Sequence, residues 1–136
     1  MRMNRGRQRG MFLLQNVMAM ALFSVGALAV LALSASAKRQ SADAHYRAVA
    51  SMLVADLTAR MRIGPRDADA LATLYHGQGA GARRFGSDAA PVLPGVPGNP
   101  PAIVVSDDGN VVVTLRWKAP GEPASHQYVA ATRIAE

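Results

Sequence analysis

The sequence contains no cysteine, so no disulfide can support its fold. Its three histidines, His45, His76 and His126, are isolated, and none has a second ligand at metal-binding spacing. No nucleophile is paired with a base in a recognisable arrangement. We therefore expect no enzyme activity, no metal site and no cofactor, and packing of apolar side chains must stabilise the protein.

Formal charge is absent from Met11 to Ala37, a run of 27 residues rich in Ala, Leu, Met and Phe. A helix needs about 20 residues to cross a hydrocarbon core of roughly 30 Å. Four arginines precede this run, at positions 2, 5, 7 and 9, whereas only Lys38 and Arg39 closely follow it. The asymmetry predicts a single-pass helix with a cytoplasmic N-terminus.

Two cleavage sites are compatible with this N-terminal region. Ala35-Ser36-Ala37 has the small-x-small form of a secretory signal-peptidase site, and a cut there would release a small secreted domain. The apolar run is longer than the roughly 7–15 residues of an ordinary signal peptide, however. The second site is the glycine that ends the basic leader, Gly10.

The residues around Gly10, Gln8-Arg9-Gly10-Met11-Phe12-Leu13-Leu14, resemble the class III signal of type IV pilins and pseudopilins. The resemblance implies that a prepilin peptidase cuts between Gly10 and Met11 and N-methylates Met11. It implies that residues 1–10 are the leader and 11–37 a transmembrane and filament helix. Phe12, Leu14 and Gln15 then fall at positions that act in subunit assembly.

Gln15 departs from the family pattern, which has glutamate at this place. In the resembling pilins that glutamate is thought to neutralise the N-terminal amine of a neighbouring subunit. Glutamine can donate and accept hydrogen bonds but cannot neutralise an amine. Two hypotheses follow: the subunit joins the initiating complex near the filament tip, or glutamine is merely tolerated in a rarely used subunit.

The helical pattern continues past the membrane segment. Apolar residues recur at spacings of three and four: Tyr46, Val49, Leu53, Leu57 and Met61. They predict an amphipathic half, residues 38–63, that ends at Gly64-Pro65. Arg60-Met61-Arg62 before a proline-containing turn resembles the V-type minor pilins, the type IV pilus modification proteins, although type II pseudopilins share a similar pattern.

Residues 64–101 are rich in glycine and proline, so we expect loop there, apart from a short helix at Asp67–Tyr75. The glycines at positions 77, 79 and 81 fit no nucleotide-binding fingerprint, and no predicted strand precedes them. Arg83-Arg84-Phe85 is the domain's one basic–aromatic patch, and a solvated loop is the favoured interpretation of it.

Strands are predicted only in residues 102–136. Ala102–Val105 is followed by the turn Asp107-Asp108-Gly109 and then by an alternating strand that contains Leu115 and Trp117. A last strand covers Tyr128–Ile134. The fold class is therefore α+β and pilin-like: a long N-terminal helix packed on about three antiparallel strands, with Leu53, Leu57, Leu115 and Trp117 in the core.

The formal net charge of +6 reflects mainly the leader, since removal of its four arginines leaves 11 basic against 9 acidic residues. The excess of basic residues thus indicates the orientation of the helix in the membrane rather than nucleic-acid binding, and we expect no nucleic-acid partner. The resemblance implies a minor type IV pilin of the inner membrane with a periplasmic C-terminal domain. Its implied partners are other pilins, the prepilin peptidase, the assembly platform and membrane lipid. A minor pseudopilin of a type II secretion system is the nearest alternative.

Overall fold

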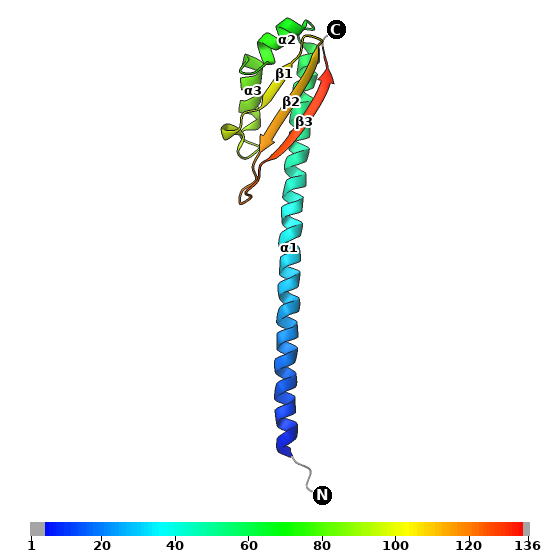
Figure 1. Ribbon diagram of the computed structural model, residues 1–136, viewed down its shortest axis with the longest axis vertical. Coiled ribbons are helices and arrows are strands. Elements are labelled where there is room, and N and C mark those ends of the chain that lie inside the picture. Colours follow the sequence, from blue (N-terminus) through cyan, green and yellow to red (C-terminus); the bar gives the residue numbers. More distant parts are fainter. Residues whose placement is uncertain (1–4, 135–136) are drawn as a thin grey trace. The chain divides into compact units, whose positions relative to one another are not determined.

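The computed structural model of this protein describes the backbone of residues 5–134 and the side chains of residues 10–134. The elements, in chain order, are α1 (Arg5–Ile63), α2 (Ala68–Tyr75), α3 (Ala80–Ala89), the 3-10 turn η1 (Val96–Gly98), β1 (Ala102–Val105), β2 (Asn110–Trp117) and β3 (His126–Arg133) (Figure 1). This confirms the α+β class, with a long apolar N-terminal helix and a small antiparallel sheet. The first part of the expected leader, residues 1–4, lies outside the described residues.

The chain divides into two compact units, Met1–Ala42 and Asp43–Glu136. Helix α1 contributes to both. Its residues 10–42 have no other described element in their unit, whereas its residues 43–63 form part of the C-terminal domain.

Helix α1 begins at Arg5, before the expected start at Met11. Arginine and glutamine are good helix formers, and a single glycine such as Gly10 costs a helix only about 1 kcal/mol, so the glycine does not interrupt it. The C-terminal end of α1, at Ile63, lies where the sequence predicted it, directly before Gly64-Pro65. The amide of Gly64 donates to the carbonyls of Arg60 and Met61 at 3.2 and 3.3 Å, and Pro65 follows.

One face of α1 packs into the domain core. Ala50, Val54, Leu57 and Met61 are buried there, whereas Leu53 is only partly buried at the margin of the core. The predicted burial of Leu57 and Met61 is confirmed, whereas in the first half of the stripe the most buried residues are Ala50 and Val54, one position after the predicted Val49 and Leu53. Ala50 has a small side chain that permits close approach of the sheet, so the centre of the contact lies on Ala50 and Val54 rather than on Leu53.

The three strands form a meander in the order β1-β2-β3, with both pairs antiparallel. Ser106 donates its amide to the carbonyl of Asn110 at 2.9 Å, and Gly109, at φ +76°, donates to the carbonyl of Ser106 at 2.9 Å. This is a three-residue hairpin loop in which glycine takes the left-handed position. The buried residues of β2 alternate as predicted: Val111, Val113, Leu115 and Trp117 face the core.

The expectation of loop across residues 64–101 is wrong in its middle. Helix α2 occurs as predicted, capped by the Asp67 carboxylate, which accepts from the amide of Ala70 at 3.2 Å. Helix α3 then occupies Ala80–Ala89, and it buries Ala82, Phe85 and Ala89 at helical spacing. Glycine was interpreted as a loop signal, but Gly81 lies inside α3, where it leaves room for the Tyr75 side chain. A Cβ at residue 81 would lie 2.4 Å from the Tyr75 ring.

Candidate functional site

The predicted processing and assembly residues all lie on α1. Gly10, Met11, Phe12, Leu14 and Gln15 are helical, and each is exposed. Met11 is 74% exposed, Phe12 71% and Leu14 66%. An ideal Cβ built on Gly10 meets nothing within 4 Å. These side chains therefore have no packing role among the described residues, and a function for them must come from outside the chain.

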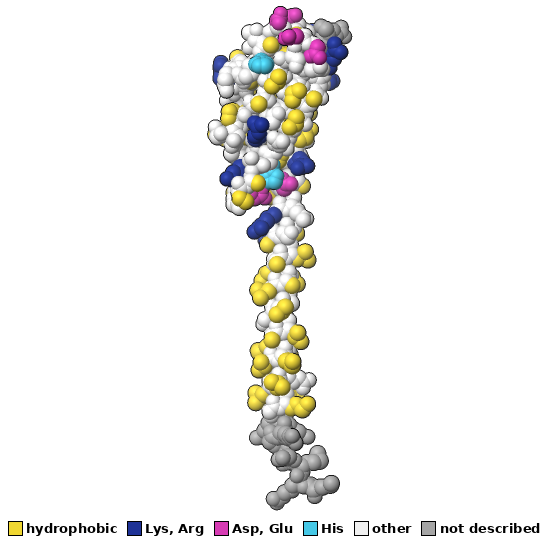
Figure 2. All heavy atoms as spheres, viewed as in Figure 1, with side chains coloured by type: hydrophobic (Ala, Val, Ile, Leu, Met, Phe, Trp, Pro, Cys, Tyr) yellow, Lys and Arg dark blue, Asp and Glu magenta, His cyan; other side chains and the backbone are white. Residues whose placement is uncertain are grey.

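The exposed apolar surface continues along the helix. Large hydrophobic side chains stand exposed at the following positions: Leu13, Val17, Met18, Met20, Leu22, Phe23, Val25, Leu28, Val30, Leu31 and Leu33. Figure 2 shows hydrophobic side chains along this part of α1. Helix α1 is long and apolar enough to cross a membrane from Gly10 onward, by length and composition. Water is an unfavourable solvent for so much apolar surface, which requires lipid or other helices around it.

The few polar groups of this segment fit an apolar surrounding. The hydroxyl of Ser24 donates to the carbonyl of Met20 at 2.8 Å, one turn earlier, so it needs no outside partner. The helix also satisfies its own backbone hydrogen bonds, as hydrocarbon requires. Gln15 and Asn16 are the amide side chains of the segment, and both are exposed. They can hydrogen-bond to a neighbouring helix without introducing a charge.

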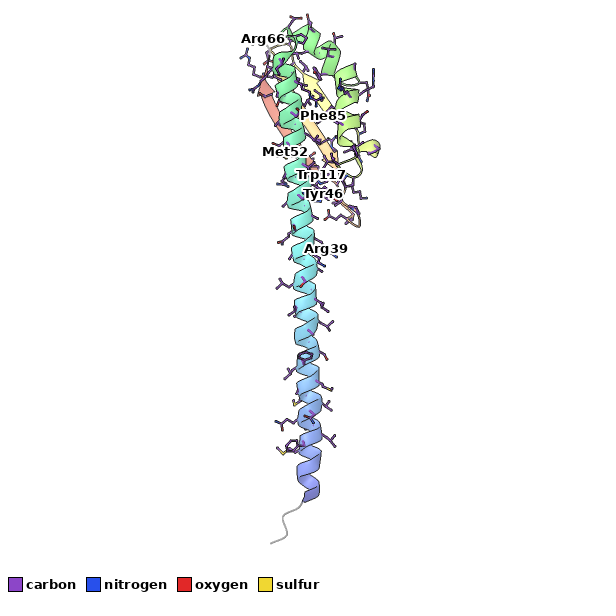
Figure 3. The ribbon with its side chains drawn as sticks, turned by 180° about the vertical axis from the view of Figure 1, so that it is seen from behind. Arg39, Tyr46, Met52, Arg66, Phe85 and Trp117 are labelled. Carbon is purple, nitrogen blue, oxygen red and sulfur yellow. The ribbon has the colours of Figure 1, made fainter. Side chains whose placement is uncertain are left out.

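The domain core forms around the sheet. Leu115 and Trp117 are fully buried and Leu57 almost fully. Figure 3 shows Phe85 and Trp117, which come from α3 and β2 respectively, and both belong to this core. The patch Arg83-Arg84-Phe85 is thus helical rather than a solvated loop: Phe85 is buried and the two arginines are exposed.

His126 precedes the expected last strand, Tyr128–Ile134, but in the structure it begins β3 and is partly buried. Its Nε2 lies 2.5 Å from a Glu122 carboxylate oxygen, and its Nδ1 lies 3.4 Å from an Asp43 oxygen. The ring stacks on Trp117 with centroids 5.8 Å apart. The cluster links α1 to the segment before β3.

The other two histidines are also separate from one another. His76 Nδ1 accepts from the amide of Val105 at 3.3 Å, and the ring of His45 lies beside that of Tyr46. Within residues 10–134, no group of three His, Asp or Glu side chains is arranged to hold a metal ion.

A groove of about 320 Å³ separates α1 from α3 in the domain. Leu57 and Phe85 contribute apolar surface to it. Arg60 lines one side and contacts Asp56 at 2.6 Å and Asp88 at 3.5 Å. These ion pairs are solvent-exposed and contribute little to stability. Arg60, Asp56 and Asp88 are engaged with one another, whereas Arg84 lines the groove without an ion pair to a described residue.

Searches against protein-family models, curated proteins and solved structures found no match to this chain. Two features of the chain bear on its function: the exposed apolar part of α1 that follows Gly10, and the continuation of α1 into the domain core.

Proposed function

We propose that this protein is a minor type IV pilin, a structural subunit that primes or modifies pilus assembly by inserting α1 into a bundle of pilin helices. The observation that carries the proposal is the exposure of the apolar side chains from Met11 to Leu33, directly after a basic leader that ends in Gly10. Such a surface needs lipid before assembly and other helices after it. The same helix then supplies one face of the domain core.

In this proposal the apolar part of α1 waits in the inner membrane. The leader arginines hold the N-terminus in the cytoplasm, and the domain lies in the periplasm. On assembly, the helix exchanges lipid contacts for contacts with major and other minor pilins at the assembly platform. Lipid tails are as apolar as leucine, so packing and interhelical hydrogen bonds, rather than the hydrophobic effect, drive this exchange. Gln15 provides one such hydrogen-bonding group.

Processing would occur at the bond between Gly10 and Met11, and a prepilin peptidase would methylate the new N-terminus. This bond lies inside α1, so the peptidase must unwind the helix locally before it cuts. Gly10 favours that step because glycine gains more conformational freedom than any other residue when a helix opens.

The test compares Gly10→Val with Gly26→Val in cells that contain a prepilin peptidase. Neither glycine has an atom within 4 Å of an added Cβ, so both variants should keep the structure of α1. Gly10→Val should retain the leader and remain unmethylated, whereas Gly26→Val should be processed like wild type. Intact-mass spectrometry of the membrane fraction distinguishes them. Full processing of Gly10→Val would contradict the assigned bond.

A second candidate is a small secreted domain released by a cut after Ala37. The observation in its favour is that the compact C-terminal unit begins at Asp43, so the cut would leave that unit whole. Under this alternative the mature chain begins at Lys38 and is found outside the membrane fraction. The same mass measurement identifies it.

A further inference from the structure

The two edges of the sheet differ. Strands β1 and β3 are its edge strands, because the order is β1-β2-β3. In β1 two of the outward backbone groups are occupied: the carbonyl of Ile103 accepts from the amide of Gly77 at 3.1 Å, and the amide of Val105 donates to His76 Nδ1 at 3.3 Å. The segment between α2 and α3 therefore closes this edge to any further strand.

The β3 edge is open. Register places Val111 opposite Thr132, and the amide of Ile134 donates to the carbonyl of Gly109 at 3.0 Å, so the even-numbered residues of β3 bond to β2. The N–H and C=O groups of the odd-numbered residues point away from the sheet: Gln127, Val129, Ala131 and Arg133. Among the described residues, none of these backbone groups has a hydrogen-bond partner.

The open edge also lacks the usual protection. Soluble proteins guard edge strands with proline, charged residues, bulges or a covering element. Residues 128–132 of β3, Tyr-Val-Ala-Ala-Thr, contain no proline and no charge, and they pair regularly with β2. Arg133, at the end of β3, is the nearest charge.

The middle of the outer face beside this edge is apolar. Val129 is 52% exposed and Val104 47% exposed. Val104 pairs with Val112, which pairs with Ala131, so these side chains form a row across the sheet. Figure 2 shows hydrophobic side chains on the domain surface. An added strand would extend this row and cover Val129.

Charge around the open edge indicates what kind of strand it accepts. Three arginines border it: Arg133 on β3, Arg116 on β2 opposite Gln127, and Arg62 on α1, which donates to the Thr132 hydroxyl at 3.3 Å. No carboxylate of the described residues forms an ion pair with any of them. The carboxylates of Asp43 and Glu122 contact His126, at the end of β3 that lies nearest Arg116.

We propose that β3 is a docking edge for an extended acidic segment of a partner protein, which adds to the sheet as a fourth strand. Main-chain hydrogen bonds to the four odd-numbered residues of β3 supply affinity. On the outer face of the sheet, apolar side chains in the middle of the segment contact Val129 and Ala131, and acidic side chains at its ends meet Arg133 and Arg116, which share that face. An acidic side chain on the other face of the segment meets Arg62. A second copy of this chain would bring its own arginines to the same edge, so it fits the site less well. This inference does not depend on the proposed function.

The test uses the full-length chain in detergent micelles and an eight-residue peptide with valines in its middle and glutamates at both ends. Residue-resolved amide exchange is measured with and without peptide. We expect saturable binding that slows exchange at Gln127, Val129, Ala131 and Arg133. A peptide with lysine in place of glutamate should bind more weakly. The acidic peptide with its backbone nitrogens methylated should not bind, because it cannot donate the main-chain hydrogen bonds.

Variants of the protein separate backbone from charge effects. The Val129 amide points away from β2, so Val129→Pro removes an outward donor and leaves the β2–β3 bonds in place; it should weaken acidic-peptide binding at least about threefold. Arg133→Glu should weaken it while improving binding of the lysine peptide. Arg83→Glu on α3 makes the same change in charge away from β3 and should have no effect. Unchanged fluorescence of Trp117 verifies the fold of each variant.

Three results would overturn the proposal. The first is no slowing of the four amides at millimolar acidic peptide. The second is equal binding of the methylated peptide, or equal binding to Val129→Pro. The third is protection of the same amides without peptide that disappears on dilution, which would identify a second copy of the chain as the occupant.

Discussion

Leu115 offers a direct test of how the domain is stabilised. Its side chain is fully buried in the centre of β2. Truncation to alanine should cost about 2–5 kcal/mol, through lost transfer free energy and the cavity that remains. The C-terminal unit, Asp43–Glu136, has 94 residues, for which a total stability of about 5–14 kcal/mol is expected. Leu115→Ala should therefore remove a large part of the free energy of unfolding, because no disulfide supports this domain.

The assay is urea unfolding of the full chain in micelles, followed by the fluorescence of Trp117. This residue is the chain's single tryptophan and is itself buried, so its emission reports on the core. Leu115→Ala should lower the midpoint by at least about 1 M, given the usual dependence on urea. Val104→Ala, on the exposed outer face of β1, is the control and should change it little. Equal midpoints for these two variants would refute the packing argument.

Three further predictions concern α3, His126 and α1. Gly81→Ala should destabilise the domain by about 1–3 kcal/mol, because its Cβ would lie 2.4 Å from the Tyr75 ring. Gly86→Ala, whose Cβ would make an ordinary contact with Pro101, should stabilise the domain by about 0.5–1 kcal/mol. Urea unfolding should therefore show changes of opposite sign for the two variants. His126→Ala should lower stability by about 1 kcal/mol or more, since it removes the stacking partner of the core tryptophan and the ring nitrogen that contacts Glu122; a melt equal to wild type would contradict this. Gln15→Glu should disturb pilus initiation or let the subunit enter the filament shaft if the protein acts near the tip; unchanged pilus number and unchanged subunit content per filament would reject the tip hypothesis.

The sequence predicted those elements whose pattern is local. In β2, the alternation that includes Leu115 and Trp117 matches the observed burial, and the turn at Asp107-Asp108-Gly109 forms as expected because glycine there adopts φ +76°. The end of α1 at Ile63 follows equally from Gly64-Pro65. Each of these signals depends on residues within a few positions of one another.

Features that depend on distant residues were missed. Helix α3 was taken for loop because glycine usually interrupts helices, and only the position of the Tyr75 ring explains why a glycine is needed at residue 81. The His126 cluster was missed because Asp43 comes from α1, far away in sequence. The closed edge of β1 likewise depends on His76 and Gly77, which are more than 20 residues away in sequence. Hydrophobic periodicity within a strand carries no information about such a distant contact.

Under the proposed function, α1 remains part of the chain after cleavage at Gly10 and anchors the domain through its exposed apolar residues. The decisive measurement is intact-mass spectrometry of the native chain, extracted from membranes and filaments of cells with a prepilin peptidase. We expect a chain that begins at Met11 and carries one additional methyl group. A chain that begins at Lys38, or one that retains all ten leader residues in filaments, would contradict it.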